Sequence, residues 1–195
     1  MRAELRKEYK RIANQHELNN FFIKYKASLN EIYEPRTITS LYFDTSDLAL
    51  YKSSIFNDSD STKLRIRTYS NSKKYSKEIK KNNFAGKSKT IENLEIESFN
   101  DVNKIFLNGM TLYPLLFTKY DRRYFSFENC RVTLDTNISF LPHSFRGGCF
   151  TEKYFLDNII EYKANGKNFD IEKYIDSNPV AFSKFKYGVK KIYGY

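Results

Sequence analysis

The sequence has 195 residues, enough for one domain with a sizeable buried core. It carries 33 Lys and Arg against 23 Asp and Glu, and the net charge of +10 favours an anionic partner such as polyphosphate, a nucleotide, nucleic acid or acidic lipid. No apolar run approaches the roughly 20 residues that a membrane-spanning helix needs. Cys130 and Cys149 lack the spacing of a metal site. We therefore expect a soluble, cytoplasmic protein, and its 16 Tyr and 17 Phe indicate a β-rich fold.

The first part of the chain predicts a strand, a helix and a second strand. Alternation over residues 4–12 indicates a strand. The charged residues that share one of its faces are Arg6, Glu8 and Lys10. Asn14 is expected to cap a helix over 15–29, because apolar residues recur there at helical spacing. A strand over 37–45 and a short helix around 48–51 follow.

The stretch from residue 63 to residue 89 is the most informative part of the sequence. Leu64 and Ile66 alternate with cations, so a strand over 63–69 would have one apolar and one basic face. A polar turn separates it from a second strand over 75–81. The charged residues that the strands of this stretch would present are Lys63, Arg65, Arg67, Glu78, Lys80, Lys87 and Lys89. Short turns would place these faces side by side, and such a surface suits phosphate chains and a divalent metal.

The second half of the chain continues the pattern of strands. A short helix is expected within 100–109, closed by its glycine, and strands are expected over 115–127, 131–136 and 155–163. The charged side chains that these strands would present in alternation are Arg122 and Arg123, Arg131 and Asp135, and Glu161 and Lys163. Residues 182–188 are expected to be helical in part.

The alternation is compatible with two arrangements of the sheet. If the apolar faces point inward, the protein has an ordinary core and a basic exterior. If the polar faces point inward, the sheet closes around an electropositive tunnel, where the exclusion of water strengthens the attraction for an anion. Periodicity alone leaves both arrangements open.

Seven short segments occur in the order seen in one known family. They are residues 6–10, 40–45, 63–67, 78–80, 131–135, 160–163 and 182–184. Through them the chain, from about residue 4 to residue 190, resembles the polyphosphate polymerase domain of the vacuolar transporter chaperone (VTC) type, within the triphosphate tunnel metalloenzymes (CYTH-like). The resemblance implies one domain over 1–195 with an α+β fold, in which a closed antiparallel β-barrel with a cationic interior carries flanking helices.

The resemblance also implies an activity and the residues that perform it. In such polymerases the γ-phosphoryl group of ATP is transferred to a growing inorganic polyphosphate chain, with the help of Mn²⁺ or Mg²⁺. The residues implied as catalytic are Lys10, Arg65, Arg67, Lys80, Arg131 and Lys184. Those implied in substrate binding are Arg6, Lys63, Ser183, Lys87 or Lys89, and Arg122 or Arg123. The register of the strand leaves the choice between the two arginines open. The implied metal ligands are Glu161 and Glu8.

Departures from the hydrolytic branch of the superfamily favour the polymerase. The first motif, Arg6-x-Glu8-x-Lys10, has one glutamate fewer than the Glu-x-Glu-x-Lys of the hydrolases, and Lys163 stands where a second acid might sit. A phosphohydrolase of triphosphate or nucleotide and a non-catalytic polyphosphate-binding module remain the alternatives. The expected partners are ATP and inorganic polyphosphate or triphosphate. Nucleic acid is not expected, because no recognisable binding motif accompanies the basic strands. Export of the product across a membrane would need a separate membrane partner.

Overall fold

The computed structural model of the chain describes residues 7–57, 59–70, 72–84, 86–128, 130–143, 154–164 and 180–195. The helices that it describes are α1 (Gln15–Tyr25), α2 (Ala49–Phe56) and α3 (Lys184–Tyr193), with a 3₁₀ turn, η1 (Phe99–Asp101). The strands are β1 (Lys7–Ala13), β2 (Leu29–Asp44), β3 (Ser61–Tyr69), β4 (Tyr75–Asn83), β5 (Gly86–Leu94), β6 (Ile105–Leu107), β7 (Met110–Phe127), β8 (Cys130–Pro142), β9 (Tyr154–Leu156) and β10 (Asn158–Ala164). None of the described helices has the length and apolar character needed to cross a bilayer.

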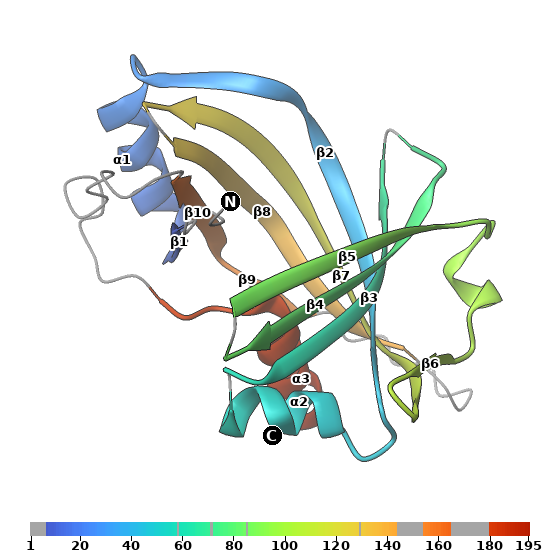
Figure 1. Cartoon of the computed structure of the whole chain (residues 1–195). Helices are drawn as coiled ribbons and strands as arrows, with labels where there is room; N and C mark the ends of the chain where they lie inside the picture. Colours follow the sequence, from blue (N-terminus) through green and yellow to red (C-terminus); the bar gives the residue numbers. More distant parts are fainter. Residues whose placement is uncertain are drawn as a thin grey trace, which may run out of the picture. The chain divides into compact units, whose positions relative to one another are not determined.

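The strands form a mainly antiparallel sheet (Figure 1). Hydrogen-bonded neighbours follow the order β1-β10-β8-β7-β2-β3-β4-β5, with β6 on β7 and β9 on β8. This architecture confirms the predicted α+β class. In the described part of the chain the order is an open path, so the closed barrel stays a prediction.

The chain divides into two compact units, which we describe separately. Unit 1 comprises residues 1–36, 120–138 and 156–182, and unit 2 comprises residues 37–119, 139–155 and 183–195. The division cuts β2, β7 and β8, so each of these strands contributes residues to both units. The expectation of one domain over 1–195 stays a prediction.

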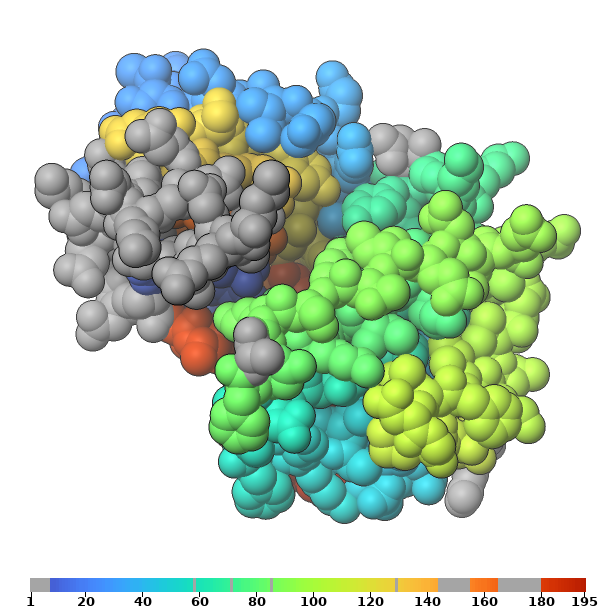
Figure 2. Space-filling view, in the orientation of Figure 1, coloured from blue at the N-terminus to red at the C-terminus, as the bar shows by residue number. Residues whose placement is uncertain are grey.

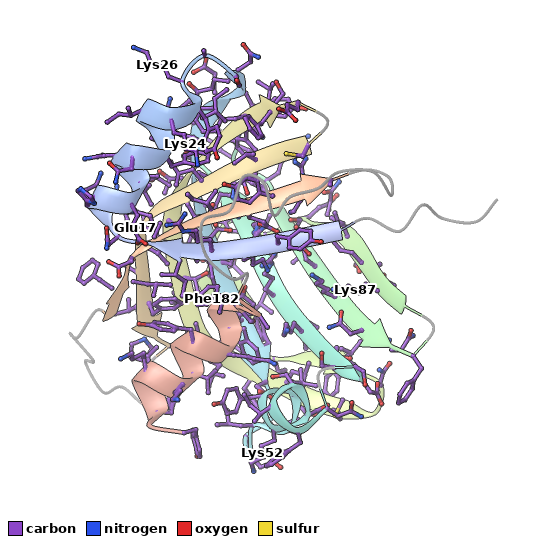
Figure 3. All side chains as sticks on the ribbon, turned by 90° about the vertical axis from the view of Figure 1, so that its left-hand side faces the viewer. Glu17, Lys24, Lys26, Lys52, Lys87 and Phe182 are labelled. Carbon is purple, nitrogen blue, oxygen red and sulfur yellow. The ribbon has the colours of Figure 1, made fainter. Side chains whose placement is uncertain are left out.

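Unit 1 has its core between α1 and the strands β7, β8 and β10. Leu18 and Phe21 of α1 are buried against apolar residues of these strands, as the helical spacing predicts. The helix begins with a capping box in which the Asn14 side chain accepts from the Glu17 amide at 2.9 Å and the Glu17 carboxylate accepts from the Asn14 amide at 2.8 Å. Glu17 also pairs with Arg11 of β1 at 3.0 Å, and Figure 3 labels it at the start of α1 beside this strand.

The predicted bounds of this helix and of the next strand are wrong. The helix ends at Tyr25 rather than at residue 29, and Leu29 already begins β2. Pro35 lies within β2, where we expected a connection that ends before residue 37. Ile32 and Tyr33 have high strand propensity and precede Pro35, so the strand can extend through a residue that lacks only one hydrogen-bond donor.

Unit 2 has its own core, between one face of β2, β3 and β7 and the segment from Leu94 to Leu107. Leu64 and Ile66 of β3 are fully buried in it, so the predicted apolar face of this strand is confirmed. Helix α3 packs against β8 and β2 in this unit. Gly188 lies against Phe140 of β8, and Phe185 stacks on Tyr42 of β2 with a centroid distance of 5.2 Å.

The prediction of a short helix within 100–109 is wrong. Phe99–Asp101 forms a single 3₁₀ turn, and Ile105–Leu107 forms strand β6, which pairs with the start of β7. Asn108 and Gly109 join the two strands, and both have positive φ, 50° and 76°. An Asn-Gly pair with positive φ is the preferred connection of a tight hairpin, so Gly109 closes a turn rather than a helix.

Candidate functional site

Three lysines lie side by side on the polar face of unit 2. Lys63 of β3 is in register with Lys80 of β4, and Lys80 is in register with Lys89 of β5. Directly opposite residues of antiparallel strands have their Cβ atoms about 4.5–5.5 Å apart, and like charges there repel. β5 is exposed along nearly its whole length, and its side chains lie on the surface in the green part of Figure 2. A negative charge that lies close to such a row offsets this repulsion.

Glu78 is the carboxylate at the centre of this face. Its Oε2 accepts from Arg65 Nε at 2.7 Å and from Arg65 Nη2 at 2.5 Å. Its Oε1 accepts from Lys89 Nζ at 2.9 Å, and Arg67 Nη1 lies 3.7 Å from Oε2. Burial alone would raise the pKa of Glu78, but Arg65, Arg67 and Lys89 outweigh it and lower the pKa to about 2. Glu78 is 4% exposed and Arg67 is 5% exposed, so the centre of this polar face is shielded from water.

Residues of β2 and α3 complete this group in unit 2. Arg67 Nε donates to the buried Ser40 hydroxyl at 3.0 Å, and Arg65 Nη1 donates to the Tyr42 hydroxyl at 2.9 Å. Burial raises the pKa of Tyr42, but Arg65, Arg67 and Lys184 together lower it, which indicates that Lys184 acts on the same place. We call the set Ser40, Tyr42, Lys63, Arg65, Arg67, Glu78, Lys80, Lys89 and Lys184 the basic cluster.

A second group of charged side chains lies in unit 1. Arg122 of β7 donates two hydrogen bonds to the Asp135 carboxylate of β8, at 2.5 and 2.7 Å. Arg122 Nη2 lies 3.8 Å from Glu161 Oε2 of β10. Lys163 bridges two carboxylates, at 3.0 Å from Glu161 and 3.5 Å from Glu8 of β1. Burial raises the pKa of Glu161, but its contact with Glu8 and the surrounding cations hold the pKa well below its usual range. We call these five residues the carboxylate cluster.

The comparisons with known proteins identify the family. The VTC domain family matches residues 5–98 and 73–193, which together cover nearly the whole sequence. The chain belongs to the VTC domain family. This result confirms the family that the seven segments predicted. No protein of curated function matches this VTC domain in sequence.

Solved structures share the fold of this VTC domain at low sequence identity. A putative adenylate cyclase from Bacillus halodurans has a TM-score of 0.59 at 13% identity, over 97% of both chains. The PH1819 protein of Pyrococcus horikoshii has a TM-score of 0.60 at 12% identity, over 95% of this chain and 99% of its own. A putative adenylyl cyclase from Hippeastrum, described as having a dominant triphosphatase activity, has a TM-score of 0.53 at 14% identity, over 94% and 95%. These likenesses show that the chain shares the fold of these solved structures, and the closed barrel stays a prediction.

The remaining cations singled out from the sequence lie in different surroundings. Lys10 is in register with Glu161, and its Nζ donates to the Phe182 carbonyl at 3.2 Å. Arg131 is in register with Lys163, and its buried Nε has no hydrogen-bond partner in the described part of the chain. Lys87 is exposed near the β4–β5 turn (Figure 3).

Two further predicted site residues make contacts outside the charged clusters, and one lies outside the described residues. Arg123 points to the side of β7 opposite Arg122, where it binds Glu31 at 2.9 and 3.0 Å, so the structure places only Arg122 in the carboxylate cluster. Ser183 accepts from the Lys186 amide at 3.5 Å and caps α3. Arg6 lies outside the described residues. The roles expected for all of these residues stay predictions.

The carboxylate cluster supplies oxygen ligands of the kind that a hard divalent cation prefers. The carboxyl groups of Glu8 and Glu161 contact each other, and the Thr133 hydroxyl lies 3.5 Å from Glu161 Oε2. Within the described residues, no three or more Asp, Glu, His or Cys side chains gather to form a site by themselves. Glu8 and Glu161 are the residues that could hold a hard divalent cation here, and its remaining ligands would have to come from outside this pair.

Three residues that fix the cations of the clusters were not among the site residues predicted from the sequence. Asp135 holds Arg122, and Ser40 and Tyr42 hold Arg67 and Arg65. A signal was present for Asp135, because an acid inside a strand of apolar residues is unfavourable unless it is paired. For the other two, nothing local distinguished them from ordinary strand residues.

Proposed function

We propose that this VTC domain is a metal-dependent polyphosphate polymerase, which transfers the γ-phosphoryl group of ATP to a growing inorganic polyphosphate chain. The row Lys63, Lys80 and Lys89 is the observation that carries the proposal, because three lysines in register on adjacent strands suit a linear, multiply charged anion. Family membership supports the same reading.

Phosphoryl transfer requires mostly positioning and neutralisation of charge, and the basic cluster offers both. Arg65 and Arg67 present planar, forked donors whose orientation is fixed by Glu78 and Ser40. Lys80 and Lys184 add compact charges that follow the phosphate oxygens as they shift during transfer. In our proposal these cations orient the terminal phosphate of the chain for attack on the γ-phosphorus of the donor.

The carboxylate cluster would hold the metal ion of the reaction. Glu161 and Glu8 are the proposed ligands of Mn²⁺ or Mg²⁺, which would supply positive charge to neutralise and polarise phosphate oxygens. Lys163 pairs with both glutamates, so fewer carboxylate oxygens are available for a second metal or for the activation of water. This feature favours transfer to phosphate over hydrolysis.

The proposal includes two expectations about architecture and place. A closed barrel would surround the phosphate chain with the polar faces and limit the access of water to the γ-phosphoryl group. A cytoplasmic location would give access to ATP, and a separate membrane partner would be needed to move the product across a bilayer.

A second candidate function is hydrolysis of triphosphate. The protein from Hippeastrum, which shares this fold, is described as having a dominant triphosphatase activity. The same cations could hold a triphosphate whose terminal group is released to water. A module that binds polyphosphate without turnover is the third candidate.

The products formed from ATP test these candidates. Purified protein is incubated with ATP and Mn²⁺, and phosphate chains are separated by length on a gel. We expect a ladder of long chains that is lost in Lys80→Ala and kept in Lys77→Ala. Lys77 is the matched control, because it lies on the opposite face of β4 and pairs with the exposed Glu92 at 2.6 Å. Orthophosphate alone would support the hydrolase, and bound ATP without any product would support the binding module.

A further inference from the structure

Two tyrosines and an arginine of unit 1 form an open aromatic platform. Tyr33 and Arg36 belong to β2, and Tyr124 belongs to β7. The two rings meet edge to face at a centroid distance of 5.6 Å, and the Arg36 guanidinium lies 5.8 Å from both centroids. We call these three residues the Tyr–Arg–Tyr platform.

Arg36 of the platform can still donate hydrogen bonds to a ligand, whereas a neighbouring arginine is already satisfied by a carboxylate. Arg123, next to Tyr124 on β7, also lies over two rings, at 4.9 and 5.5 Å, but the Glu31 carboxylate satisfies it with two hydrogen bonds. Arg36 has no carboxylate partner among the described residues, and its buried Nε has no hydrogen-bond partner there. Tyr33 is 52% exposed, so the platform is accessible from solvent.

The position of the platform relates it to the carboxylate cluster. Tyr124 follows Arg122 by two residues on the same strand, so both side chains leave β7 on one face, about 7 Å apart along the strand. Phe125 points the other way, into the core with α1. A spacing of this order corresponds to the separation between the phosphates of a nucleotide and its base. A nucleotide with phosphates at Arg122 could therefore bring its base to Tyr124.

We propose that the Tyr–Arg–Tyr platform binds the base of the nucleoside triphosphate donor. This inference rests on the proposed function, in which the metal ion held by the carboxylate cluster, to which Arg122 belongs, acts on phosphate oxygens. Aromatic rings stack on any nucleobase, since each base has a π face, and the guanidinium of Arg36 adds hydrogen-bond donors toward the base or the ribose. The platform thus distinguishes ATP from inorganic triphosphate and polyphosphate, which have no base, and it discriminates weakly among the bases.

The test compares two ligands that share a triphosphate and differ in the base. Dissociation constants for ATP and for inorganic tripolyphosphate, both with Mn²⁺, are measured by calorimetry for the wild type, Tyr33→Ala, Tyr33→Phe and Arg36→Met. We expect Tyr33→Ala to weaken ATP binding about 5-fold to 150-fold, while tripolyphosphate binding changes less than about twofold. Arg36→Met should act in the same direction, and Tyr33→Phe, which keeps the ring, should bind ATP like the wild type. Tyr195→Ala is the control, because Tyr195 is a similarly exposed tyrosine, at 61%, in unit 2.

Each result decides the inference. Equal weakening of both ligands, or unchanged ATP affinity in both Tyr33→Ala and Arg36→Met, would overturn it, and so would a wild type that binds neither ligand. The proposed function fails separately. If the wild type binds ATP but forms no polymer, the polymerase is refuted, and the platform still stands when the variants lose affinity for ATP alone. Arg36→Met keeps the test decisive if Tyr33→Ala does not fold, which thermal denaturation of each variant reports.

Discussion

Replacement of Glu78 by glutamine tests whether this one carboxylate holds the centre of the basic cluster. Glu78 is 4% exposed and contacts Arg65 at 2.5 and 2.7 Å and Lys89 at 2.9 Å. Glutamine keeps the size of the side chain and removes its charge, so it resembles the protonated glutamate. The change removes the negative charge that Arg65, Arg67 and Lys89 face.

The magnitude follows from the pKa of Glu78. In the folded protein this pKa is about 2, against an ordinary value of 4.5. Because the folded value is the lower one, the carboxylate stabilises the protein above pH 4.5, and this stabilisation is lost as the pH falls from 4.5 toward 2. At about 1.4 kcal/mol for each pKa unit, a difference of between 2 and 3 units corresponds to about 3 kcal/mol at pH 7 and, by linkage, about 1 kcal/mol at pH 3.

Urea denaturation of the wild type and of Glu78→Gln between pH 3 and pH 7 measures this contribution. The difference in unfolding free energy between the two proteins should fall by about 2 kcal/mol over this range, with most of the fall below pH 5. Glu92→Gln is the matched control on the adjacent strand. Glu92 is 58% exposed in its pair with Lys77, so its replacement should cost less than about 1 kcal/mol.

One result would refute the reasoning. If Glu78→Gln destabilises the protein by the same amount at pH 3 as at pH 7, the loss comes from packing or hydrogen bonding of the side chain, and the cations do not depress its pKa. Destabilisation below about 0.5 kcal/mol at pH 7 would contradict the buried contacts themselves.

Three further predictions concern packing, capping and reactivity in the two units. Gly188→Ala places a Cβ 2.7 Å from the ring of the fully buried Phe140, so it should lower the unfolding free energy by about 1–3 kcal/mol, measured by urea denaturation. Asp44→Asn should cost about 1–3 kcal/mol in the same assay, because the buried carboxylate accepts from the amides of Leu50 and Tyr51 at 2.9 Å and an amide group would turn a donor toward one of them. Cys130 should react with iodoacetamide only in denaturant, since burial raises the pKa of its thiol to about 12; rapid alkylation of the native protein, followed by mass spectrometry, would contradict this.

The strand faces could be predicted because their pattern is local. Alternation of cations with Leu64 and Ile66 identifies both faces of β3, and a short polar turn keeps β4 beside it. The placement of Lys63 beside Lys80 follows from these two facts, and the position of Lys89 depends in addition on the pairing of β5 with β4. Which of Arg122 and Arg123 joins the carboxylate cluster was open in the sequence, because it depends on the side of β7 that faces α1.

Other features depend on contacts that the sequence does not display. Ile105 to Leu107 is too short to show a period, and it becomes a strand because β7 pairs with it through the turn at Asn108 and Gly109. The Asn-Gly pair was a usable signal for a hairpin. The bridge that Lys163 makes between Glu8 and Glu161 requires β1 and β10 to be neighbours, although they are about 150 residues apart in sequence.

Several cations of both clusters are paired with carboxylates in the structure. Arg65 and Lys89 are bound to Glu78, Arg122 to Asp135, and Lys163 to Glu161. An incoming anion therefore competes with a carboxylate for each cation that it takes over. A chloride ion would gain one contact at the expense of another, whereas a phosphate chain can replace several at once while remaining a single molecule. Under the proposed function, these ion pairs would select for anions of high valence, and would favour long phosphate chains over the small anions of the surrounding solution.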